Sequence, residues 1–284
     1  MARLTDVHCH LLPPELRPRD APSWRDPWFA ACMAGERTRF AAGDDVLAAL
    51  ELAGLERAVV FGWPFADPGL LAQVNDYVAA EAARAPDRLL GLAVVNPARP
   101  GWEAELERSR SLGLVGVGEL NSDAQGFELA FAGGLARLLN LAAEISWPVL
   151  LHASEPVGHR YPGKGSARPE RLWELLAPAL EQLPQLRLCL AHLGGGLPLF
   201  AHMPEVRTLC QRLWFDTAAL PFLYHQQVLP ALEELLGPGR LCLGSDFPLL
   251  PPARYRHLWG GDAPGAGAIV GEGPASWLGA AAAS

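Results

Sequence analysis

The sequence predicts an α/β fold in which eight parallel strands and the helices between them form a (β/α)8 TIM barrel, as a single domain over residues 1–284. Three observations lead to this prediction. Eight short runs rich in Val, Leu and Ala are apolar on both faces, which is typical of a parallel sheet covered by helices. Amphipathic stretches of helical length separate these runs. The pattern also fits the roughly 250 residues typical of such barrels.

An open, doubly wound sheet would show a similar alternation of strands and helices. That fold usually carries Gly-x-Gly-x-x-Gly directly after its first strand. Here His8-Cys9-His10 stands at that place instead, so the barrel is the preferred prediction.

The first strand is expected at Thr5–His10, and a long connection, Leu11–Gly43, follows it. Prolines dense enough to forbid a long regular element occur here, at Pro13, Pro14, Pro18, Pro22 and Pro27. A connection of this length usually serves as a lid or binding loop, so we interpret it as a lid. The alternative is a loop whose aromatic residues, Trp24, Trp28 and Phe29, only anchor it to the surface.

The remaining elements alternate regularly along the chain. Seven further strands are expected at Arg57–Phe61, Leu89–Val95, Leu114–Leu120, Val149–His152, Leu186–His192, Trp214–Thr217 and Arg240–Ser245. A helix capped by Asp44 or Asp45 should run to Leu52, where Gly54 ends it. The other helices are expected at Leu70–Arg84, Trp102–Leu112, Phe127–Ile145, Pro169–Leu183, Leu199–Leu213 and Gln226–Leu236.

The composition narrows the classes of partner. A formal net charge of −8 and a pI near 5.5 argue against nucleic acid or an anionic membrane as a partner. No apolar run is long enough to span a bilayer, and the first strand begins too early to leave room for a signal peptide. Five scattered cysteines without Cys-x-x-Cys spacing indicate reduced thiols, so we expect a cytoplasmic protein.

The stretch Asp6-Val7-His8-Cys9-His10 organises the functional prediction. Successive side chains of a strand point to opposite faces, so His8 and His10 should share one face, with Val7 and Cys9 on the other. Residues two apart on a strand are roughly 6.5 to 7 Å apart at the backbone, near enough for both imidazoles to reach one metal ion.

Polar residues close several of the later strands, and the carboxyl ends of barrel strands are where catalytic groups gather. These residues are Glu119, His152, His192 and Asp246. Each alone has an ordinary explanation as a hydrogen-bonded residue of the rim. Together with His8 and His10 they would meet at one mouth, where burying so many titratable groups without a cation would be costly. Imidazoles and carboxylates are ligands that divalent zinc or manganese prefers.

These motifs resemble the amidohydrolase superfamily, and more narrowly its amidohydrolase-related branch of metal-dependent hydrolases and decarboxylases. The matching segments are Asp6-Val-His8-Cys-His10-Leu-Leu-Pro, His152, His192-Leu-Gly-Gly-Gly, Gly244-Ser-Asp246-Phe-Pro and the ending Ile269–Gly279. The resemblance therefore runs from end to end, and it implies a barrel that often forms an oligomer.

The resemblance also implies a set of site residues. His8, His10, His152 and Asp246 would bind the metal, with His192 as a further ligand or as an acid and electrophile beside it. The fourth strand has no lysine, which excludes a carboxylated-lysine bridge between two metals. Gly116-Val-Gly118-Glu119 instead resembles the glutamate strand of TatD-type nucleases, where the carboxylate is a ligand. We expect zinc first and manganese second, as one or two ions, with the role of Glu119 open between direct ligand and histidine partner.

The mechanism that follows is metal-assisted hydrolysis of an amide, ester, lactone or phosphoester. Asp246 would take the proton of the attacking water and return it to the leaving group, while His192 polarises the electrophile. The alternative is a non-oxidative decarboxylase of an aromatic or unsaturated carboxylic acid. A third interpretation is a barrel that has lost catalysis and binds its ligand only.

The loop after the fifth strand suggests an anionic small-molecule substrate. Ser154–Arg168 contains the only lysine of the chain, Lys164, together with His159 and Arg160. Cations beside a predicted active site favour a carboxylate or phosphate on the substrate. A solvated loop paired with nearby acids is the alternative. Trp63 could supply an apolar wall to the site or only pack.

Overall fold

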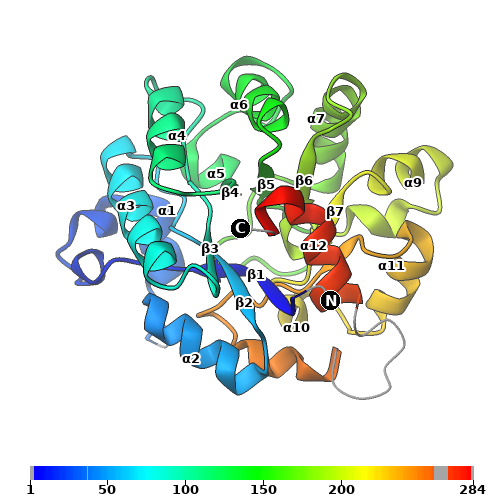
Figure 1. Cartoon of the computed structure of the whole chain (residues 1–284). Helices are drawn as coiled ribbons and strands as arrows, with labels where there is room; N and C mark the ends of the chain where they lie inside the picture. The colour runs from blue at the N-terminus through cyan, green and yellow to red at the C-terminus, as the bar shows by residue number, and fades with distance from the viewer. Residues whose placement is uncertain (1–2, 37, 259–267, 283–284) are drawn as a thin grey trace.

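The computed structural model describes residues 3–36, 38–258 and 268–282, and it confirms the predicted barrel (Figure 1). Its strands run parallel in sequence order, in one group β1-β2-β3 and a second group β4-β5-β6-β7-β8. The strands are β1 (Thr5–His10), β2 (Arg57–Phe61), β3 (Leu89–Gly91), β4 (Val117–Leu120), β5 (Pro148–Leu151), β6 (Arg187–Leu190), β7 (Trp214–Asp216) and β8 (Leu241–Cys242).

Backbone hydrogen bonds bridge both seams between the two groups of strands. At the β3–β4 seam, the amide of Ala93 donates to Gly116 at 2.9 Å, and the amide of Gly118 donates to Ala93 at 2.9 Å. At the β8–β1 seam, the amide of Val7 donates to Leu243 at 2.7 Å. The ring of strands is therefore continuous, which brings the ends of β1 and β8 side by side.

Helices surround this ring (Figure 1). The main ones are α2 (Gly43–Ala53), α3 (Pro68–Arg84), α4 (Trp102–Ser111), α6 (Gly133–Glu144), α7 (Pro169–Gln182), α9 (Pro204–Cys210) and α11 (Val228–Leu236). Short helices α5 (Ser122–Gln125), α8 (Ala191–Gly194), η3 (Leu197–Phe200), α10 (Leu220–Leu223) and η4 (Pro252–Leu258) lie in the connections. Local signals set their limits: Asp67 accepts a hydrogen bond from the amide of Leu70 at the start of α3, and Gly54 ends α2 at a φ of 73°.

Several predicted elements differ from the structure, and strands β4 and β8 are each shorter than predicted. The helix predicted over Leu199–Leu213 is wrong as a single element: it is split into η3 and α9. Pro204 begins the second piece because proline has no N–H to continue a helix that precedes it. The helix predicted from Phe127 begins only at Gly133. The strand predicted to Val95 pairs as a strand only to Gly91.

The pairing of β1 also departs from simple alternation. Its register with β2 shifts between Asp6 and Cys9. As a result Val7 and Cys9 lie in different apolar clusters, so the prediction that they share one face is wrong. His8 and His10 still point toward the same centre, because their Nε2 atoms are 3.2 Å apart.

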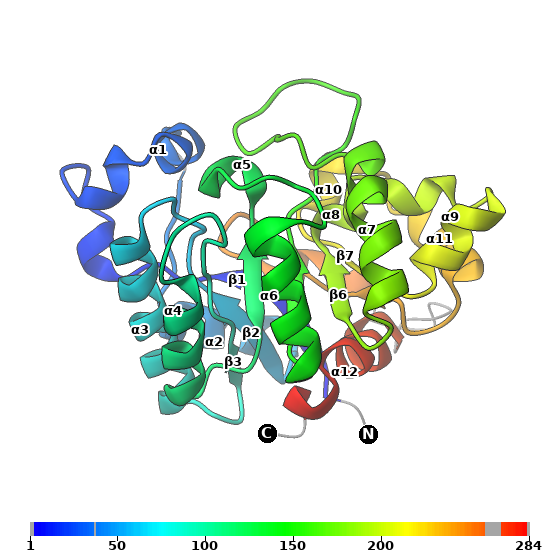
Figure 2. The same ribbon diagram turned by 90° about the horizontal axis from the view of Figure 1, so that it is seen from above.

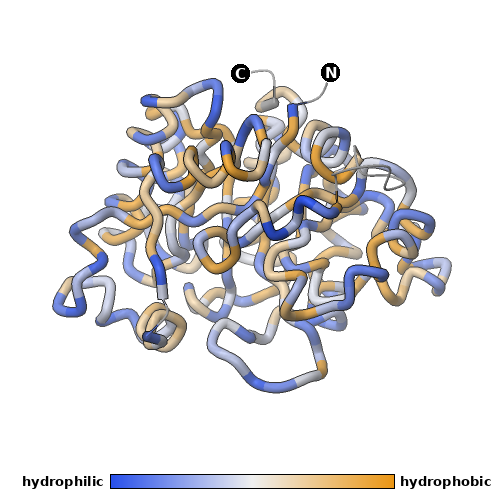
Figure 3. Tube along the Cα trace, turned by 90° about the horizontal axis from the view of Figure 1, so that it is seen from below, coloured by the Kyte–Doolittle hydropathy of each residue, from blue (hydrophilic) through white to orange (hydrophobic). Residues whose placement is uncertain are grey.

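The core has two parts, as expected of a barrel. One cluster lies mainly between the strands and the surrounding helices, and includes Leu139, Leu176 and Leu190. The other includes Val59, Leu150 and Cys189 and extends into the segment after β1. Figure 3 shows the hydrophobic colour concentrated on the inner segments and the hydrophilic colour on many outer bends.

The segment after β1 forms part of the upper end of the barrel in the view of Figure 2. It contains short helices that each begin with proline: η1 (Pro14–Leu16), η2 (Pro22–Arg25) and α1 (Pro27–Met33). Phe29 anchors it, with ring centroids 5.6 Å from Trp63 and 5.3 Å from Phe65. No described helix has the length and apolar character needed to cross a membrane.

The opposite end of the barrel is covered by the last described segment, η5 (Ala268–Glu272), α12 (Gly273–Leu278) and η6 (Gly279–Ala282) (Figure 2). Helix α12 contacts β1, β6 and β8, and Trp277 is fully buried there. The indole of Trp214 donates to the Ser276 hydroxyl at 2.7 Å, which fixes the helix against β7. This segment therefore closes the barrel on the side away from the predicted site.

We expect Trp277→Ala to lower the free energy of unfolding by about 3–5 kcal/mol, because it leaves a cavity in a fully buried position. Urea denaturation measures the change. Leu52→Ala, at a side chain that is 72% exposed on α2, should change it by less than about 0.5 kcal/mol. A loss below about 1 kcal/mol in Trp277→Ala would show that this end of the barrel does not depend on the terminal helix.

Candidate metal centre

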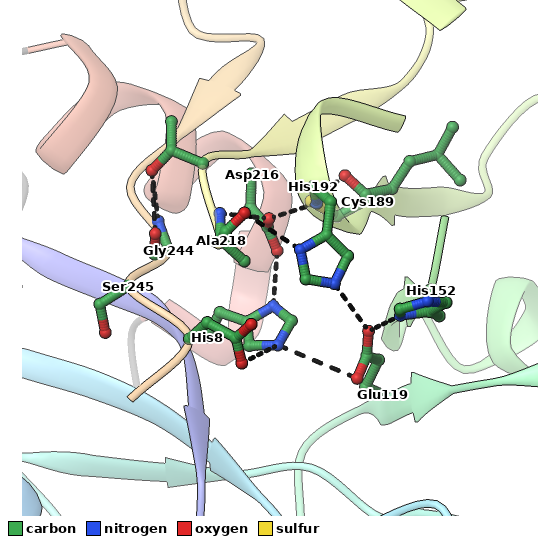
Figure 4. A network of polar contacts seen from close by, with 12 residues as sticks. His8, Glu119, His152, Cys189, His192, Asp216, Ala218, Gly244 and Ser245 are labelled. Carbon is green, nitrogen blue, oxygen red and sulfur yellow. Dashed lines mark hydrogen bonds and ion pairs between the residues drawn. The ribbon is translucent and has the colours of Figure 1, made fainter. Parts of the chain in front are cut away.

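The structure brings together the six residues predicted at the strand ends; Figure 4 labels His8, Glu119, His152 and His192 among them. They come from five places in the chain: His8 and His10 from β1, Glu119 from β4, His152 after β5, His192 after β6 and Asp246 after β8. All six are buried or half-buried. The ends of strands that are distant in sequence meet at one mouth, as the barrel requires.

Three side chains, His8, His10 and Glu119, form a compact first group, and Asp246 lies beside it. The Nε2 atoms of His8 and His10 lie 3.2 Å apart, and Asp246 Oδ1 lies 3.6 Å and 3.4 Å from them. Glu119 Oε2 lies 3.9 Å from His8 Nε2 and 3.7 Å from His10 Nε2. Ligands about 2.0–2.1 Å from a tetrahedral ion lie about 3.3 Å from one another. The spacing and the donor types therefore fit a divalent ion.

The other carboxylate oxygen of Glu119 faces a second group. His152 Nδ1 lies 2.8 Å from Glu119 Oε1, and His192 Nε2 lies 3.7 Å from the same oxygen. His152 Nε2 also lies 3.1 Å from the carbonyl oxygen of Gly163. The two groups, His8-His10-Glu119 and Glu119-His152-His192, each satisfy the spacing of a metal site and share one carboxylate.

The local backbone aims two of these side chains. His192 has φ 56° and Asp246 has φ 65°, in the left-handed region that non-glycine residues rarely adopt. The amide of Asp246 donates to the carbonyl of His8 at 3.0 Å, which ties this turn to β1. The amide of His192 donates to Asp216 Oδ1 at 2.9 Å. Strained conformations of this kind persist where the surroundings hold them, commonly at functional sites.

Asp216, at the end of β7, is a site residue that the sequence analysis did not select. It is fully buried, and its Oδ2 accepts a hydrogen bond from His8 Nδ1 at 2.8 Å. That bond fixes a proton of His8 on Nδ1, and Nε2 then faces His10, Glu119 and Asp246. The signal was available, because Asp216 closes an apolar strand in the same way as the selected residues do.

The charges of the site shift the pKa values of its groups. Burial alone would lower the pKa of His8, but Asp216, Glu119 and Asp246 together raise it to about 10. Burial likewise opposes ionised His192, yet the nearby carboxylates of Glu119 and Asp246 raise its pKa to about 9. Burial would raise the pKa of Asp246, but the surrounding histidines lower it to about 2. Without a metal, protons on the imidazoles balance the carboxylates.

A cavity of about 940 Å³ opens beside these groups. Two of the predicted substrate-binding residues, Trp63 and His159, line it, as does Arg39 of the segment after β1. Arg160 is exposed and does not line the cavity. Lys164 is absent from the wall as well, because its ammonium group bonds within its own loop.

We expect Asp216→Asn to lower the affinity for zinc by about 10–100-fold, because the amide no longer orients His8 as a carboxylate does. Competition with a chromophoric chelator measures the dissociation constant. Asp44→Asn, at a carboxylate that is 79% exposed and distant from the site, is the control and should bind zinc as the natural protein does. Unchanged affinity in a folded Asp216→Asn protein would contradict the role given to this carboxylate.

Zinc binding should release protons at neutral pH. The pKa of His8 is about 10 and that of His192 about 9, so both are protonated at pH 7 before the metal binds. Ligation at Nε2 requires the unprotonated ring, so the affinity should rise with pH, by about tenfold per pH unit for each displaced proton. Calorimetry at pH 7 in two buffers of different ionisation enthalpy should give one to two protons released. A binding enthalpy that is independent of the buffer would contradict this.

Comparisons with known proteins find solved structures of similar fold. A 5-carboxyvanillate decarboxylase of Novosphingobium aromaticivorans, solved with bound manganese, is 15% identical with a TM-score of 0.77, covering 98% of this chain and 97% of that one. A 2,6-dihydroxybenzoate decarboxylase from Rhizobium is 18% identical with a TM-score of 0.71, covering 98% and 99%. A probable 2-pyrone-4,6-dicarboxylic acid hydrolase of Acinetobacter baumannii is 20% identical with a TM-score of 0.60, covering 98% and 100%.

At these identities the solved structures establish the fold. No curated protein matches the chain. The family itself is established by a sequence model described as amidohydrolase, which matches residues 5–267 and so includes all six predicted site residues. The chain therefore belongs to the amidohydrolase family.

Proposed function

We propose that the protein is a metal-dependent hydrolase that acts on a small substrate bearing a carboxylate or another anionic group. The observation that carries the proposal is the carboxylate of Glu119, whose two oxygens face two separate groups of histidines. A carboxylate placed in this way can hold an ion on either side. Sites with two adjacent ions are typical of enzymes that activate water.

His8, His10, Glu119 and Asp246 would hold the first ion, and His152 and His192 with Glu119 provide the place for a second. We propose zinc, because imidazole and carboxylate at these spacings suit it, with manganese as the alternative. When bound, a divalent ion lowers the pKa of a water molecule from 15.7 to about 7 and polarises a carbonyl or phosphoryl oxygen.

Asp246 is the proposed general base. Its pKa of about 2 keeps it ionised at neutral pH, and it lies on the cavity wall beside the first group. It would take the proton of the attacking water and return it to the leaving group. When no second ion occupies its Nε2, His192, also on the cavity wall, would instead donate a hydrogen bond to the oxygen of the substrate that gains negative charge.

The cavity wall supports an anionic substrate. Arg39 lines it and makes no ion pair with any residue of the described ranges. An unpaired guanidinium can bind a carboxylate or phosphate through two parallel hydrogen bonds. His159 lies on the same wall, and Trp63 offers an apolar face. Substrate binding by Arg160 stays a prediction only, since Arg160 does not line the cavity. Lys164 does not line it either, and a different role is proposed for it below.

Decarboxylation of an aromatic carboxylic acid is the second candidate. Two similar structures are named as decarboxylases of aromatic acids, and aromatic side chains line this cavity at Trp28, Phe29, Phe40 and Trp63. A planar aromatic acid would fit between such side chains. We further propose a cytoplasmic location, on the ground that the five cysteines are free.

Substrate assays with the zinc- or manganese-loaded protein distinguish the two reactions. The panel contains lactones, amides, phosphodiesters and hydroxybenzoates, and both water-dependent cleavage and carbon dioxide are measured. We expect hydrolysis of an anionic lactone, amide or phosphodiester. Carbon dioxide release without consumption of water would refute hydrolysis and support the decarboxylase.

We expect Asp246→Asn to lower turnover by about 10²–10⁴-fold, because the amide cannot accept the proton of the attacking water. Metal analysis of the same variant should still find most of the bound ion. Asp45→Asn is the matched control and should keep its turnover, since Asp45 also lines the cavity but its carboxylate accepts a hydrogen bond from the amide of Ala42 at 2.8 Å. Full activity in Asp246→Asn would remove the proposed base.

A further inference from the structure

The loop that follows β5, residues 154–168, extends over the mouth of the barrel and is the large green loop at the top of Figure 2. Its base is fixed by hydrogen bonds. The amide of Ser154 donates to Ala167 at 2.8 Å, and the amide of Gly165 donates to the Ser154 hydroxyl at 2.9 Å. The amide of Ser166 donates to Asp123 Oδ2 at 2.7 Å. No regular element holds the part between these anchors.

Lys164 organises that part of the loop. Its Nζ lies 3.0 Å from Glu155 Oε1 and donates to the carbonyl oxygens of Val157 at 2.5 Å and His159 at 3.3 Å. An ammonium group has three N–H donors, so these three acceptors use all of them. The Lys164 side chain is only 7% exposed, although the Val157 side chain at the tip is 74% exposed. The charge therefore points into the loop and away from solvent.

Glu155 extends the cluster to the cavity wall. Its second oxygen accepts a hydrogen bond from the Tyr161 hydroxyl at 2.8 Å. Tyr161, His159 and Gly163 all line the cavity. The carbonyl oxygen of Gly163, the residue before Lys164, lies 3.1 Å from His152 Nε2. The conformation that Lys164 fixes thus determines both the shape of the wall and a contact to a histidine of the site.

We propose that Lys164 is a positioning residue, which together with Glu155 holds the loop in the conformation that forms this wall of the cavity. It acts through Tyr161, His159 and Gly163 and does not contact the substrate. A nearly buried ammonium that has lost its carboxylate is strongly unfavourable, so removing either partner should release the same segment. Only the ligand-binding test below rests on the proposed function.

Hydrogen exchange of the loop amides tests the proposal without any ligand. We expect Lys164→Met and Glu155→Gln each to speed exchange of the amides of Lys164 and Gly165, which donate to Tyr161 and Ser154, by about tenfold or more, because the loop loses the cluster that holds these bonds in place. The double variant should exchange no faster than the faster single variant, since both changes break one cluster. Exchange in the barrel strands should not change. Val157→Ala, at the exposed tip, is the control and should alter loop exchange by less than about twofold.

Binding of 2,6-dihydroxybenzoate, measured by calorimetry, separates positioning from direct contact. A positioning role predicts that Lys164→Met and Glu155→Gln weaken binding by similar factors, and that Lys164→Arg restores part of it. Direct contact predicts unchanged or tighter binding in Glu155→Gln, because the Lys164 ammonium, freed from Glu155, could then bind the carboxylate of the ligand. Unchanged loop exchange in Lys164→Met, or tighter binding in Glu155→Gln, overturns the proposal. If the natural protein does not bind this acid, the proposed substrate class fails and hydrogen exchange alone decides the role of Lys164.

Discussion

The carboxylate of Glu119 joins the two halves of the site, and the geometry of the mouth depends on this contact. One oxygen lies within 4 Å of both His8 and His10, and the other lies 2.8 Å from His152. Burial alone would raise the pKa of this carboxyl, but the histidines around it hold the pKa well below its usual range. An ionised carboxylate in the centre of a barrel attracts cations, whether protons on imidazole or a metal, and the remaining ligands are arranged around it.

Most of the fold could be predicted from the sequence because a barrel repeats one local pattern. Apolar runs such as Arg57–Phe61 and Val149–His152 predicted buried strands between helices, and the structure has both strands within one residue of these limits. The first and last residues of a strand were harder to predict where hydrogen bonding to the neighbouring strands decides them. Residues 92–95 are buried and extended beyond β3, yet only Ala93 bridges to β4. The register shift in β1 likewise depends on its neighbours, and alternation in one strand cannot reveal it.

The candidate site was predicted for the same reason: a barrel places the carboxyl ends of its strands at one mouth. That rule selected His8, His10, Glu119, His152, His192 and Asp246, and it would also have selected Asp216 had every strand end been considered. The basic side chains that contribute to the site were harder to predict. Lys164 stands beside the site in sequence, but its three donors are used within the loop. Arg39 lies far from the other site residues in sequence, and only the tertiary structure places it on the cavity wall.

The summed charge of the site residues indicates how the site would change when it binds metal. Glu119 and Asp246 both have lowered pKa values, so both carboxylates carry a negative charge at neutral pH. The pKa of His8 is about 10 and that of His192 about 9, so both imidazole rings are positively charged at that pH. These four groups therefore sum to zero. A divalent ion at His8, His10, Glu119 and Asp246 would displace only the proton of His8, so it would leave these groups with one added positive charge. A second ion would add two positive charges, which hydroxide and an anionic substrate together could neutralise. The same electrostatic argument that accounts for the ionised carboxylates thus favours an anion as the substrate.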